Sequence, residues 1–463
     1  MTNYDILIIG SGPGGYVAAI RASQLGMKVG VVEKSELGGI CLNWGCIPTK
    51  ALLKSANVFQ YLNHSEDYGI KTGKASIDFP AVIKRSRNVA GTMSKGVHFL
   101  FKKNKIDHIV GHGTLKKGGI VEVTDQSGKK TNYQGKSIIL ATGGRARELP
   151  NLKIDGKKII GYREAMTLKS LPKSMVVVGS GAIGSEFAYF YQTLGTEVTL
   201  VEFLPRLVPM EDEEISKALE KSFKNLGINI LTNSEVTKVN TKEKGCSVTI
   251  KTKSGDKKVD AEIVLSAVGI TTNLENLGLE TVGVKHDKGK VLVDDFGKTN
   301  VEGIYAIGDI TRGLALAHVA SAEGIVCVES ILGKKPEPLN YNNIPACTYC
   351  SPEIASVGYT EEAARKNGYE IKVGRFPFSA SGKAHAGGNS EGFVKVIFDA
   401  KYGEWLGAHF IGNNVTEMIA EVVVARKLEA TGHEIIKSIH PHPTMSEAIM
   451  EATAAAYNEV IHL

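Results

Sequence analysis

Two stretches of the chain carry the same order of apolar and polar positions. An apolar run at 6–9 is followed at once by glycines, then by a predicted helix over 16–25 and a second apolar run at 29–32. The same order begins again at Met175 and reaches its second apolar run at 198–201. Short apolar runs that alternate with helices are typical of buried strands in a parallel sheet. The pattern therefore predicts two α/β units built on one plan.

Each unit has a Gly-x-Gly-x-x-Gly turn between its first strand and its helix, at Gly10–Gly15 and at Gly179–Gly184. An acid ends each second strand, Glu33 in the first unit and Glu202 in the second, and each lies 18 residues past the last glycine. Such a turn lets the backbone approach a pyrophosphate at the helix N-terminus, and the acid would hold a ribose hydroxyl. A chance glycine turn explains one motif more easily than a matched pair. The chain is predicted to bind two dinucleotides.

Further strands are expected between and after these units. Residues 137–140 are predicted to form a strand that runs into a tight turn. A second strand is predicted at 261–268, with Gly269 after it, and a third at 304–309, which ends in a polar turn at Asp309. Asp309 has the alternative of capping a following helix. From Tyr341 onward, short strands alternate with helices, for example a strand over 392–398 and a helix over 415–428. We expect domain boundaries that give four segments: 1–144, 145–269, 270–340 and 341–463.

Composition agrees with a soluble α/β enzyme. The chain has 463 residues, 43% of them hydrophobic, and 51 glycines, as expected for many strand-to-helix turns. No run of eighteen apolar residues predicts a membrane span. The chain opens directly into a strand, and nothing before it has the pattern of a targeting segment. Six cysteines fit a reducing compartment, so we expect a cytoplasmic protein.

The net charge of +6 is unevenly spread. Residues 341–463 have ten Lys and Arg against fourteen Asp and Glu, so this segment carries −4 and the first 340 residues carry +10. No Lys or Arg cluster is interleaved with aromatic residues, and the basic excess is typical of a solvated surface. We expect no nucleic-acid partner, no membrane and no metal.

Cys41 and Cys46 lie between glycines and a predicted helix that runs through 51–54. Such a pair can close a small disulfide loop if the backbone bends, and the flanking glycines allow this bend. Cys46 lies near the expected helix start, where the dipole favours a thiolate. A structural disulfide is the alternative, but a chain of this length does not need one for stability. The pair is predicted to be redox-active.

Near the C-terminus, His442 precedes Glu447 by five residues. The carboxylate would orient the imidazole and make it more basic. Alternatively, Thr444 and Glu447 form a capping box at the start of the last helix. The sequence leaves both readings open, and His440 is expected to be a structural neighbour. Cys347 and Cys350 lack the second cysteine pair of a zinc site and the context of a thioredoxin motif, and Cys246 and Cys327 are predicted to be buried.

Together these motifs resemble those of the disulfide oxidoreductase flavoproteins, class I of the pyridine nucleotide-disulfide oxidoreductases. The resemblance rests on the two glycine turns, the segment Gly38–Lys50, the Tyr-Ala-Ile-Gly-Asp sequence ending at Asp309, and the His-Pro-Thr-x-Ser-Glu sequence ending at Glu447. It covers nearly the whole chain. It implies an α/β fold with two Rossmann-like domains and a C-terminal α+β dimerisation domain, as in glutathione reductase.

The resemblance also implies two nucleotides. One non-covalent FAD per subunit would contact Gly10, Gly12, Gly14, Gly15, Glu33, Lys50, Gly113, Ala141, Thr142, Gly143, Asp309, Ala315, Leu316, Ala317 and His318. NAD would bind as co-substrate at Gly179, Gly181, Ala182, Ile183, Gly184, Glu186, Glu202, Val236 and Gly269. Many relatives have Arg after the last of these glycines, whereas this chain has Ile270, which weakens any claim about contacts there.

Within the family, the chain is most similar to members that oxidise protein-bound dihydrolipoamide and reduce NAD⁺. This similarity implies that Cys41 is attacked by the substrate, that Cys46 lies against the flavin, and that His442 with Glu447 takes the proton. Lys50 would pair with Glu186 beside the flavin. The His–Glu pair comes from the other subunit in the family, so a homodimer is implied. Implied partners are the lipoyl domains and acyltransferase core of 2-oxo acid dehydrogenase complexes, or the lipoyl carrier protein of glycine cleavage.

Two alternatives are kept. Glutathione reductase shares the cysteines and the terminal histidine, but it uses NADP, whose 2′-phosphate Glu202 would repel. A catalytically inactive flavin-bearing scaffold is the second alternative, and the presence of Cys41, Cys46, His442 and Glu447 together argues against it. Mercuric reductases have a paired-cysteine tail and soluble transhydrogenases lack one active-site cysteine, so neither fits this chain.

Overall fold

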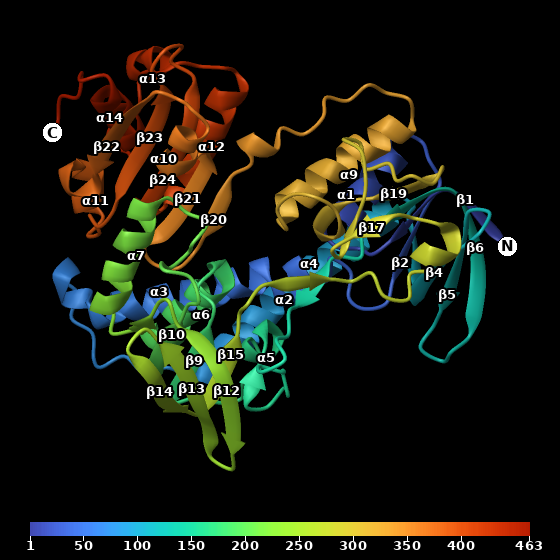
Figure 1. The fold of residues 1–463 in the computed structure, drawn as a ribbon, viewed down its shortest axis with the longest axis horizontal. Coiled ribbons are helices and arrows are strands. Elements are labelled where there is room, and N and C mark those ends of the chain that lie inside the picture. The colour runs from blue at the N-terminus through green and yellow to red at the C-terminus, as the bar shows by residue number, and fades with distance from the viewer. The chain divides into compact units, whose positions relative to one another are not determined.

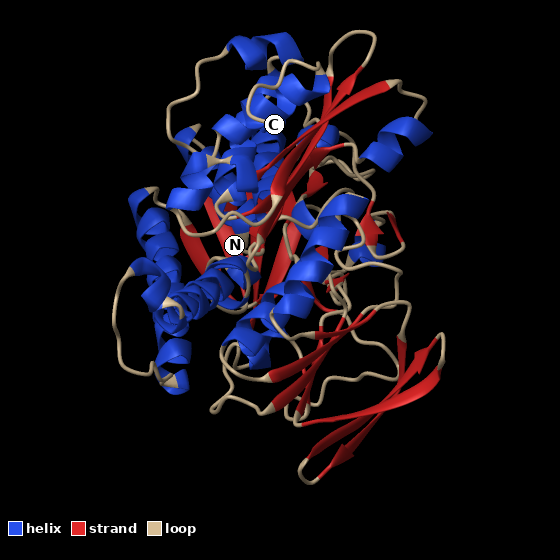
Figure 2. Ribbon diagram, turned by 90° about the vertical axis from the view of Figure 1, so that its left-hand side faces the viewer, coloured by secondary structure: helices blue, strands red, loops and turns tan.

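The computed structural model describes residues 1–463, which fold into two compact units (Figure 1). Helices pack against sheets in both units, as Figure 2 shows. No helix has the length and apolar character needed to cross a membrane. Each unit is built from three stretches of chain: Met1–Ala51, Ile83–Arg147 and Ile270–Asn340 in unit 1, and Leu52–Val82, Glu148–Gly269 and Tyr341–Leu463 in unit 2. The finer division into four segments stays a prediction.

The main sheet of unit 1 has seven strands in the order β3-β2-β1-β6-β5-β4, and β19 pairs with the C-terminal part of β6. The pairs β1–β2, β1–β6, β2–β3 and β6–β19 are parallel, while β4, β5 and β6 form an antiparallel extension. The pairs β7–β16 and β17–β18 form two separate two-stranded sheets. The strands are β1 Thr2–Ile9, β2 Val29–Glu33, β3 Asp107–Val110, β4 His112–Lys116, β5 Ile120–Thr124, β6 Lys130–Leu140, β7 Gly144–Ala146, β16 Ile270–Thr272, β17 His286–Asp287, β18 Lys290–Val291 and β19 Ile304–Ala306.

The alternation of side chains along β1 gives unit 1 two cores. Ile6 and Ile8 pack on one side with residues of the helices α1 and α9, whereas Leu7 and Ile9 pack on the other side with Leu140 and the antiparallel extension. This is the pattern of a strand that is buried on both faces. The helices are α1 Pro13–Gln24, α2 Gly39–Trp44, α3 Cys46–Asn63, α4 Phe79–Lys103, α8 Leu279–Val282 and α9 Ala317–Ile331, of which α3 and α4 continue into unit 2.

The stretch Glu148–Gly269 of unit 2, called here the first part of this unit, repeats the plan of unit 1. Its parallel sheet has the order β11-β10-β9-β15-β8, and the first four strands match β3-β2-β1-β6 in order and direction. A separate antiparallel sheet β12-β13-β14 follows. The elements are β8 Ile159–Ile160, α5 Tyr162–Ala165, β9 Ser174–Val178, α6 Ala182–Thr193, β10 Glu197–Val201, α7 Glu213–Asn225, β11 Asn229–Leu231, β12 Glu235–Lys242, β13 Gly245–Thr252, β14 Gly255–Ala261 and β15 Ile263–Ser266.

One expected strand is divided in the structure. The stretch 261–268 was predicted as a single strand, but Ala261 ends the antiparallel β14 and Ile263 begins the parallel β15. Ala261 pairs with Cys246, whereas Ile263 pairs with Met175. The chain changes sheets at Glu262, and an apolar run alone does not reveal such a change.

The last part of unit 2 is an antiparallel sheet with the order β20-β21-β24-β23-β22. Phe376, Val394, Phe410 and residues of α12 and α14 form the core on one face of this sheet. The elements are β20 Ala346–Thr348, β21 Glu353–Gly358, α10 Glu361–Lys366, β22 Ile371–Pro377, α11 Gly382–Ala386, β23 Phe393–Asp399, β24 Trp405–Gly412, α12 Val415–Lys427, α13 Gly432–Lys437 and α14 Glu447–Ala456.

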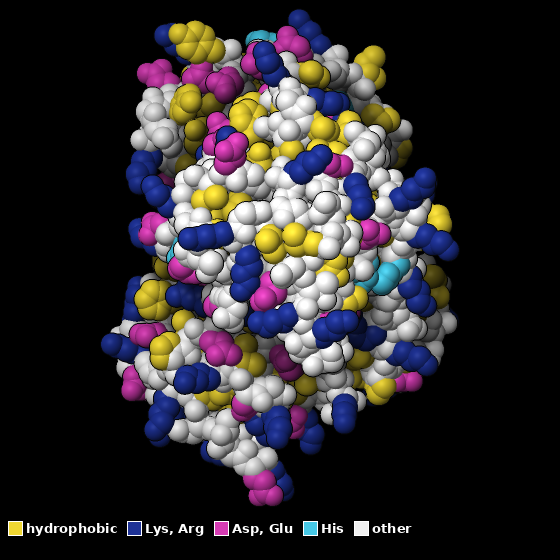
Figure 3. Space-filling view, turned by 90° about the vertical axis from the view of Figure 1, so that its right-hand side faces the viewer, with side chains coloured by type: hydrophobic (Ala, Val, Ile, Leu, Met, Phe, Trp, Pro, Cys, Tyr) yellow, Lys and Arg dark blue, Asp and Glu magenta, His cyan; other side chains and the backbone are white.

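Basic side chains are dispersed over the face drawn in Figure 3. Lys and Arg side chains alternate there with acidic, apolar and uncharged ones and do not gather into one field. This distribution agrees with the expectation that the positive net charge is a property of a solvated surface.

Candidate active site

Cys41 and Cys46 lie on two consecutive helices. Cys41 is in α2, and Cys46 is the first residue of α3. Gly45 separates the helices with φ −148° and ψ −116°, a conformation outside the helical region. Both cysteines are thiols here, and their side chains are hydrogen-bonded to one another. The structure therefore brings together the two sulfurs that the sequence placed five positions apart.

The two thiols have different electrostatic surroundings. The hydrogen bond to Cys46 and burial together raise the pKa of the Cys41 thiol well above its ordinary value, while the charge of Lys50 opposes this shift. Cys46 is exposed at the start of an 18-residue helix, where backbone N–H groups and the helix dipole stabilise a thiolate. The pair is thus asymmetric, with the pKa of Cys41 raised and Cys46 exposed at a helix N-terminus.

The two glycine turns have matching geometry. Gly10 has φ +104° and Gly179 has φ +97°. The N–H of each donates, at 2.8 Å, to the carbonyl of the residue that precedes the acid of its unit, Val32 O for Gly10 and Val201 O for Gly179. A Cβ on Gly15 would lie 1.9 Å from Gly10 O, so this close approach requires glycine. The same holds at Gly184, whose Cβ would lie 1.8 Å from the corresponding carbonyl of the second turn.

The acids of the two units are held in the same way. Glu33 Oε2 accepts from Ser11 N at 2.9 Å and from Ser11 Oγ at 2.7 Å. Glu202 Oε2 accepts from Ser180 N at 2.8 Å and from Ser180 Oγ at 2.7 Å. Both carboxylates are buried at the ends of their strands. Each turn therefore fixes the acid expected to hold a ribose hydroxyl.

The first turn fits the pyrophosphate of a dinucleotide. The first residue of α1 is Pro13, and no side chain caps the helix N-terminus at Gly12. A Cβ added to Gly12 would meet nothing within 4 Å, so the turn is open at this point. Gly14 differs, because a Cβ there would lie 3.1 Å from Ala320 O of α9, so this glycine permits close helix packing. The uncapped N–H groups and the helix dipole suit an anion.

The other residues predicted to contact FAD lie near the ends of the unit 1 strands. Gly113 is in β4, and a Cβ there would lie 3.2 Å from the side chain of Ile9. Ala141, Thr142 and Gly143 follow β6, and Ala315 to His318 span the start of α9. Ligands of parallel sheets bind beyond the carboxyl ends of the strands, which is where most of these residues lie.

Asp309 lies in a turn that two charged residues hold, and sequence reasoning missed both. Glu323 Oε2 accepts from Gly308 N at 2.6 Å, and Lys290 Nζ donates to Asp309 O at 2.5 Å. Burial raises the pKa of the Asp309 carboxyl, and the charge of Lys290 opposes the shift. The signal for Glu323 was present, since an acid within the apolar helix Ala317–Ile331 needs a polar partner. Lys290 had no comparable signal.

The residues predicted to contact NAD are spread over the first part of unit 2. Ala182, Ile183 and Glu186 are in α6, and Gly269 follows β15 with φ +102°. Glu186 is buried and accepts from Tyr349 N at 3.1 Å. Val236 is buried in the core formed with Val176 and Val201, so its predicted contact with adenine stays a prediction. So does the Lys50–Glu186 pair, because these two residues belong to different units.

The loop after Glu202 is fixed at both ends. Val208 N donates to Ser180 O at 3.2 Å, and Val208 has φ +39°, an unusual conformation for a β-branched residue. At the far end, Asp212 caps α7 and accepts from the buried Lys395 Nζ at 3.0 Å. Lys395 also contacts Glu214 and Glu361, each at 2.8 Å. This network around the buried Lys395 of β23 attaches the loop after Glu202 to the sheet β20-β21-β24-β23-β22.

His442 and Glu447 form a hydrogen-bonded pair. His442 Nδ1 lies 2.8 Å from Glu447 Oε1, and Glu447 Oε2 accepts from Thr444 N at 2.8 Å. Burial raises the pKa of the Glu447 carboxyl, but these two bonds hold it below its ordinary value. The Thr444 hydroxyl donates to Pro441 O, and α14 begins at Glu447 with Ser446 as its N-cap, so the expected Thr444–Glu447 capping box does not form. The His442 side chain is 80% exposed.

His440, Cys347 and Cys350 take no part in the hydrogen bonds that form these two pairs. His440 Nε2 is 2.8 Å from Glu421 Oε1, in keeping with its expected structural role. Cys347 is in β20, whereas Cys350 is buried and lies 3.3 Å from Pro352 O. Neither forms a disulfide, and no group of histidines, cysteines and acids has the arrangement of a metal site.

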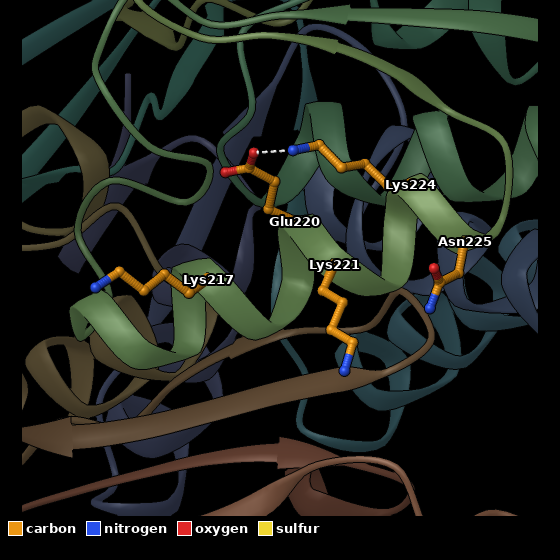
Figure 4. A pocket seen from close by; sticks show the side chains of 5 residues that line it. All are labelled: Lys217, Glu220, Lys221, Lys224 and Asn225. Atoms are coloured by element: carbon orange, nitrogen blue, oxygen red, sulfur yellow. Dashed lines mark hydrogen bonds and ion pairs between the residues drawn. The ribbon is translucent and has the colours of Figure 1, made fainter.

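A cavity of about 370 Å³ lies on the exposed side of α7. Figure 4 shows that the five residues lining it all come from this helix and that Lys224 points toward Glu220. The Lys224 Nζ lies 2.6 Å from Glu220 Oε1. The lining residues are Lys217, Glu220, Lys221, Lys224 and Asn225. None of them is among the candidate catalytic or nucleotide-binding residues.

Two family descriptions match the chain. Residues 4–324 match the pyridine nucleotide-disulphide oxidoreductase model, and residues 344–453 match the dimerisation domain of the same family. The chain belongs to the pyridine nucleotide-disulphide oxidoreductase family. Membership confirms the expected oxidoreductase activity, the expected α/β fold with a dimerisation domain, and the use of FAD and NAD.

Relatives within the pyridine nucleotide-disulphide oxidoreductase family align along the whole chain. Dihydrolipoyl dehydrogenase of Rhizobium etli is 50% identical, with 99% of each chain covered, and that of Zymomonas mobilis is 48% identical at the same coverage. Among solved structures, LpdA from Mycobacterium tuberculosis has a TM-score of 0.91 at 28% identity, covering 98% of this chain and 99% of that one. The flavoprotein disulfide reductase RclA from Escherichia coli has a TM-score of 0.88 at 26% identity, with the same coverage.

Proposed function

We propose that this protein is a dihydrolipoyl dehydrogenase, which oxidises protein-bound dihydrolipoamide to lipoamide and reduces NAD⁺ to NADH. The observation that carries the proposal is the hydrogen-bonded Cys41–Cys46 pair beside a dinucleotide turn in unit 1. A full-length relative of this name, from Rhizobium etli, is 50% identical. A second turn of the same geometry supplies the site for the co-substrate.

The glycine turn of unit 1 and the buried Glu33 would hold the pyrophosphate and ribose of FAD. Asp309, fixed by Lys290 and Glu323, would hold its polyol chain. When bound, FAD supplies the two-electron chemistry that connects a dithiol to a nicotinamide. The turn of unit 2 and Glu202 would hold NAD, and a carboxylate at this place favours a free 2′-hydroxyl over a 2′-phosphate.

The cysteine chemistry follows from the asymmetry of the pair. A substrate thiolate attacks Cys41 Sγ of the Cys41–Cys46 disulfide, which breaks the S–S bond and leaves Cys46 as a thiolate. The second substrate thiolate attacks the mixed disulfide, which releases lipoamide and leaves Cys41 to take up a proton. The substrate loses two electrons and two protons, and the protein disulfide becomes a dithiol. Lys50, one helical turn after Cys46, adds positive charge that favours the thiolate form.

His442 is proposed as the base that takes the substrate proton at its Nε2 atom. Its Nδ1 is fixed by the Glu447 carboxylate at 2.8 Å, which sets the ring orientation and leaves Nε2 to accept the proton. The hydrogen bond from Thr444 N to Glu447 Oε2 keeps this carboxylate in place. The pair has the geometry of an orienting acid and a general base.

We propose a homodimer in which His442 of the partner subunit completes each site. The dimerisation-domain match supports this proposal. The region also exposes large apolar side chains, Ile439 at 99% and Leu428 at 74% of their surface. Exposed apolar side chains in one region suit a protein interface. Lipoyl domains of 2-oxo acid dehydrogenase complexes, or the lipoyl protein of glycine cleavage, are the proposed macromolecular substrates, and the cytoplasm is the proposed location.

Steady-state turnover of the FAD-loaded protein tests the proposal. Dihydrolipoamide with NAD⁺ should give NADH, while glutathione disulfide with NADPH should give no comparable rate. The Cys46→Ser variant should be inactive and serves as the control for non-enzymatic reduction. Efficient reduction of glutathione disulfide, or no turnover of dihydrolipoamide by a flavin-saturated wild type, would contradict the proposal.

A further inference from the structure

Three consecutive residues of α4 hold the segment that carries Cys41 and Cys46. Each donates to a main-chain carbonyl of this segment: Arg85 Nη1 to Ala51 O at 2.7 Å, Ser86 Oγ to Pro48 O at 3.1 Å, and Arg87 Nη2 to Asn43 O. Ser86 is fully buried at the centre of this contact. Two cations and a hydroxyl are therefore directed at one short stretch of backbone.

Arg87 contacts the point where the two cysteine helices meet. Asn43 belongs to the last turn of α2, where the final carbonyls have no partner within the helix. The Arg87 guanidinium carbon lies 4.3 Å from the ring centroid of Trp44, the last residue of α2. A cation at a helix C-terminus is favourable, and stacking on an aromatic ring adds to it. Burial lowers the pKa of Arg87, and its Nη1 is buried without a hydrogen-bond partner.

The joint between the helices decides how the sulfurs meet. Gly45 is the only residue between Trp44 and Cys46, so its backbone angles set the direction in which α3 leaves α2. A disulfide requires a narrow range of Cβ separations and torsion angles. A side chain that fixes the end of α2 therefore limits how far Cys41 can move from Cys46.

We propose that Arg87 is a positioning residue that caps α2, fixes the joint at Gly45 and so favours the Cys41–Cys46 disulfide over the dithiol. This inference rests on the proposed redox role of the pair. In exchange with dithiothreitol, the two cysteines lose two electrons and two protons to oxidised dithiothreitol, which becomes the dithiol. The equilibrium constant of that exchange measures how well one sulfur is presented to the other.

The holoenzyme is equilibrated with mixtures of oxidised and reduced dithiothreitol. The disulfide fraction of the peptide that contains Cys41 and Cys46 is then measured by thiol alkylation and mass spectrometry. Arg87→Met should lower the equilibrium constant for disulfide formation at least about tenfold, since a charge-assisted hydrogen bond is lost. Arg85→Met is the matched control, because Arg85 lies on the same helix but donates to Ala51 O, which comes after Cys46 in the chain. This variant should leave the equilibrium constant within about twofold of the wild-type value.

An unchanged constant in Arg87→Met overturns the proposal, as does an equal shift in both variants, which would be a general effect of charge. A lower melting temperature without a shift in the constant also overturns it, because the role would then be structural only. If the methionine variant does not fold, Arg87→Gln is measured instead. Glutamine keeps an amide donor but loses the charge and the guanidinium that stacks on Trp44, so this variant should also lower the equilibrium constant. Failure of the wild-type pair to form a disulfide in any buffer would instead refute the proposed function.

Discussion

His442 Nδ1 lies 2.8 Å from Glu447 Oε1, while Glu447 Oε2 accepts from Thr444 N. One carboxylate therefore orients an exposed imidazole and satisfies the backbone before α14. A second pair on the same helix, His462 with Glu451 at 2.5 Å, has no part in the proposed chemistry. The two pairs allow the catalytic reading to be separated from a structural one.

His442→Ala should lower kcat/KM for dihydrolipoamide by roughly a hundred- to ten-thousand-fold, the range for loss of a general base. Glu447→Gln should lower activity less and should shift the acid limb of the pH–rate profile, because the bond from the charged carboxylate to the imidazole is lost. The matched control His462→Ala should retain wild-type turnover. A Glu447→Gln variant that loses about 1 kcal/mol of stability with an unmoved profile would show a capping role alone.

Glu202 should make the enzyme select NAD⁺. The buried carboxylate would bind a ribose hydroxyl and repel a 2′-phosphate, so kcat/KM should favour NAD⁺ over NADP⁺ by about a hundredfold or more. Glu202→Ala should narrow this ratio of kcat/KM values, mainly by weakening the binding of NAD⁺, and should leave the FAD content unchanged. Comparable values for the two coenzymes in the wild type would refute the assignment of the second turn.

Glu211 should make stability depend on pH near neutrality. Burial raises the pKa of its carboxyl from 4.5 to about 7. The Ser356 hydroxyl opposes this shift, and the charge of Asp212 adds to it. The buried His409 is the cross-strand neighbour of Ser356. Because the folded-state pKa lies above the unfolded value, this contribution to stability is complete below about pH 4.5 and is lost as pH rises through about 7.

Glu211→Gln should therefore stabilise the protein relative to wild type more at pH 8 than at pH 5, by on the order of 2 kcal/mol. Thermal melts at the two pH values measure the difference. Glu213→Gln, in the same stretch but exposed and paired with Lys217, is the control and should lack this trend. An equal effect of Glu211→Gln at both pH values would show that the carboxyl does not titrate in this range.

The strand, turn and helix of both nucleotide units were predictable because a Gly-x-Gly-x-x-Gly turn and a strand-ending acid are local patterns. The match between Glu33 and Glu202 also followed from spacing. Contacts between distant elements were not predictable. Lys290 and Glu323 reach the Gly308–Asp309 turn from a separate hairpin and helix, and Lys395 reaches Asp212 across 183 positions. The sequence shows that such groups exist, but only folding decides which of them meet.

Sharing of sites between subunits is tested by mixing two inactive chains. Cys46→Ser and His442→Ala are each expected to be nearly inactive alone. In a heterodimer with shared sites, one site carries both lesions and the other carries neither, so activity should return toward half of the wild-type value per heterodimer. Ile439→Glu should lower the recovery by weakening association. No recovery despite demonstrated subunit exchange would mean that each chain completes its own site.

The visible spectra of the FAD-loaded cysteine variants test the central claim most directly, because they report which sulfur lies against the flavin. Cys41→Ser should show a permanent long-wavelength absorbance, since Cys46 remains as an unpaired thiolate at the start of α3. Cys46→Ser should show no such band, because the remaining sulfur of Cys41 is not the one proposed to lie against the flavin. Identical spectra for the two variants would contradict the assigned roles of the cysteine pair.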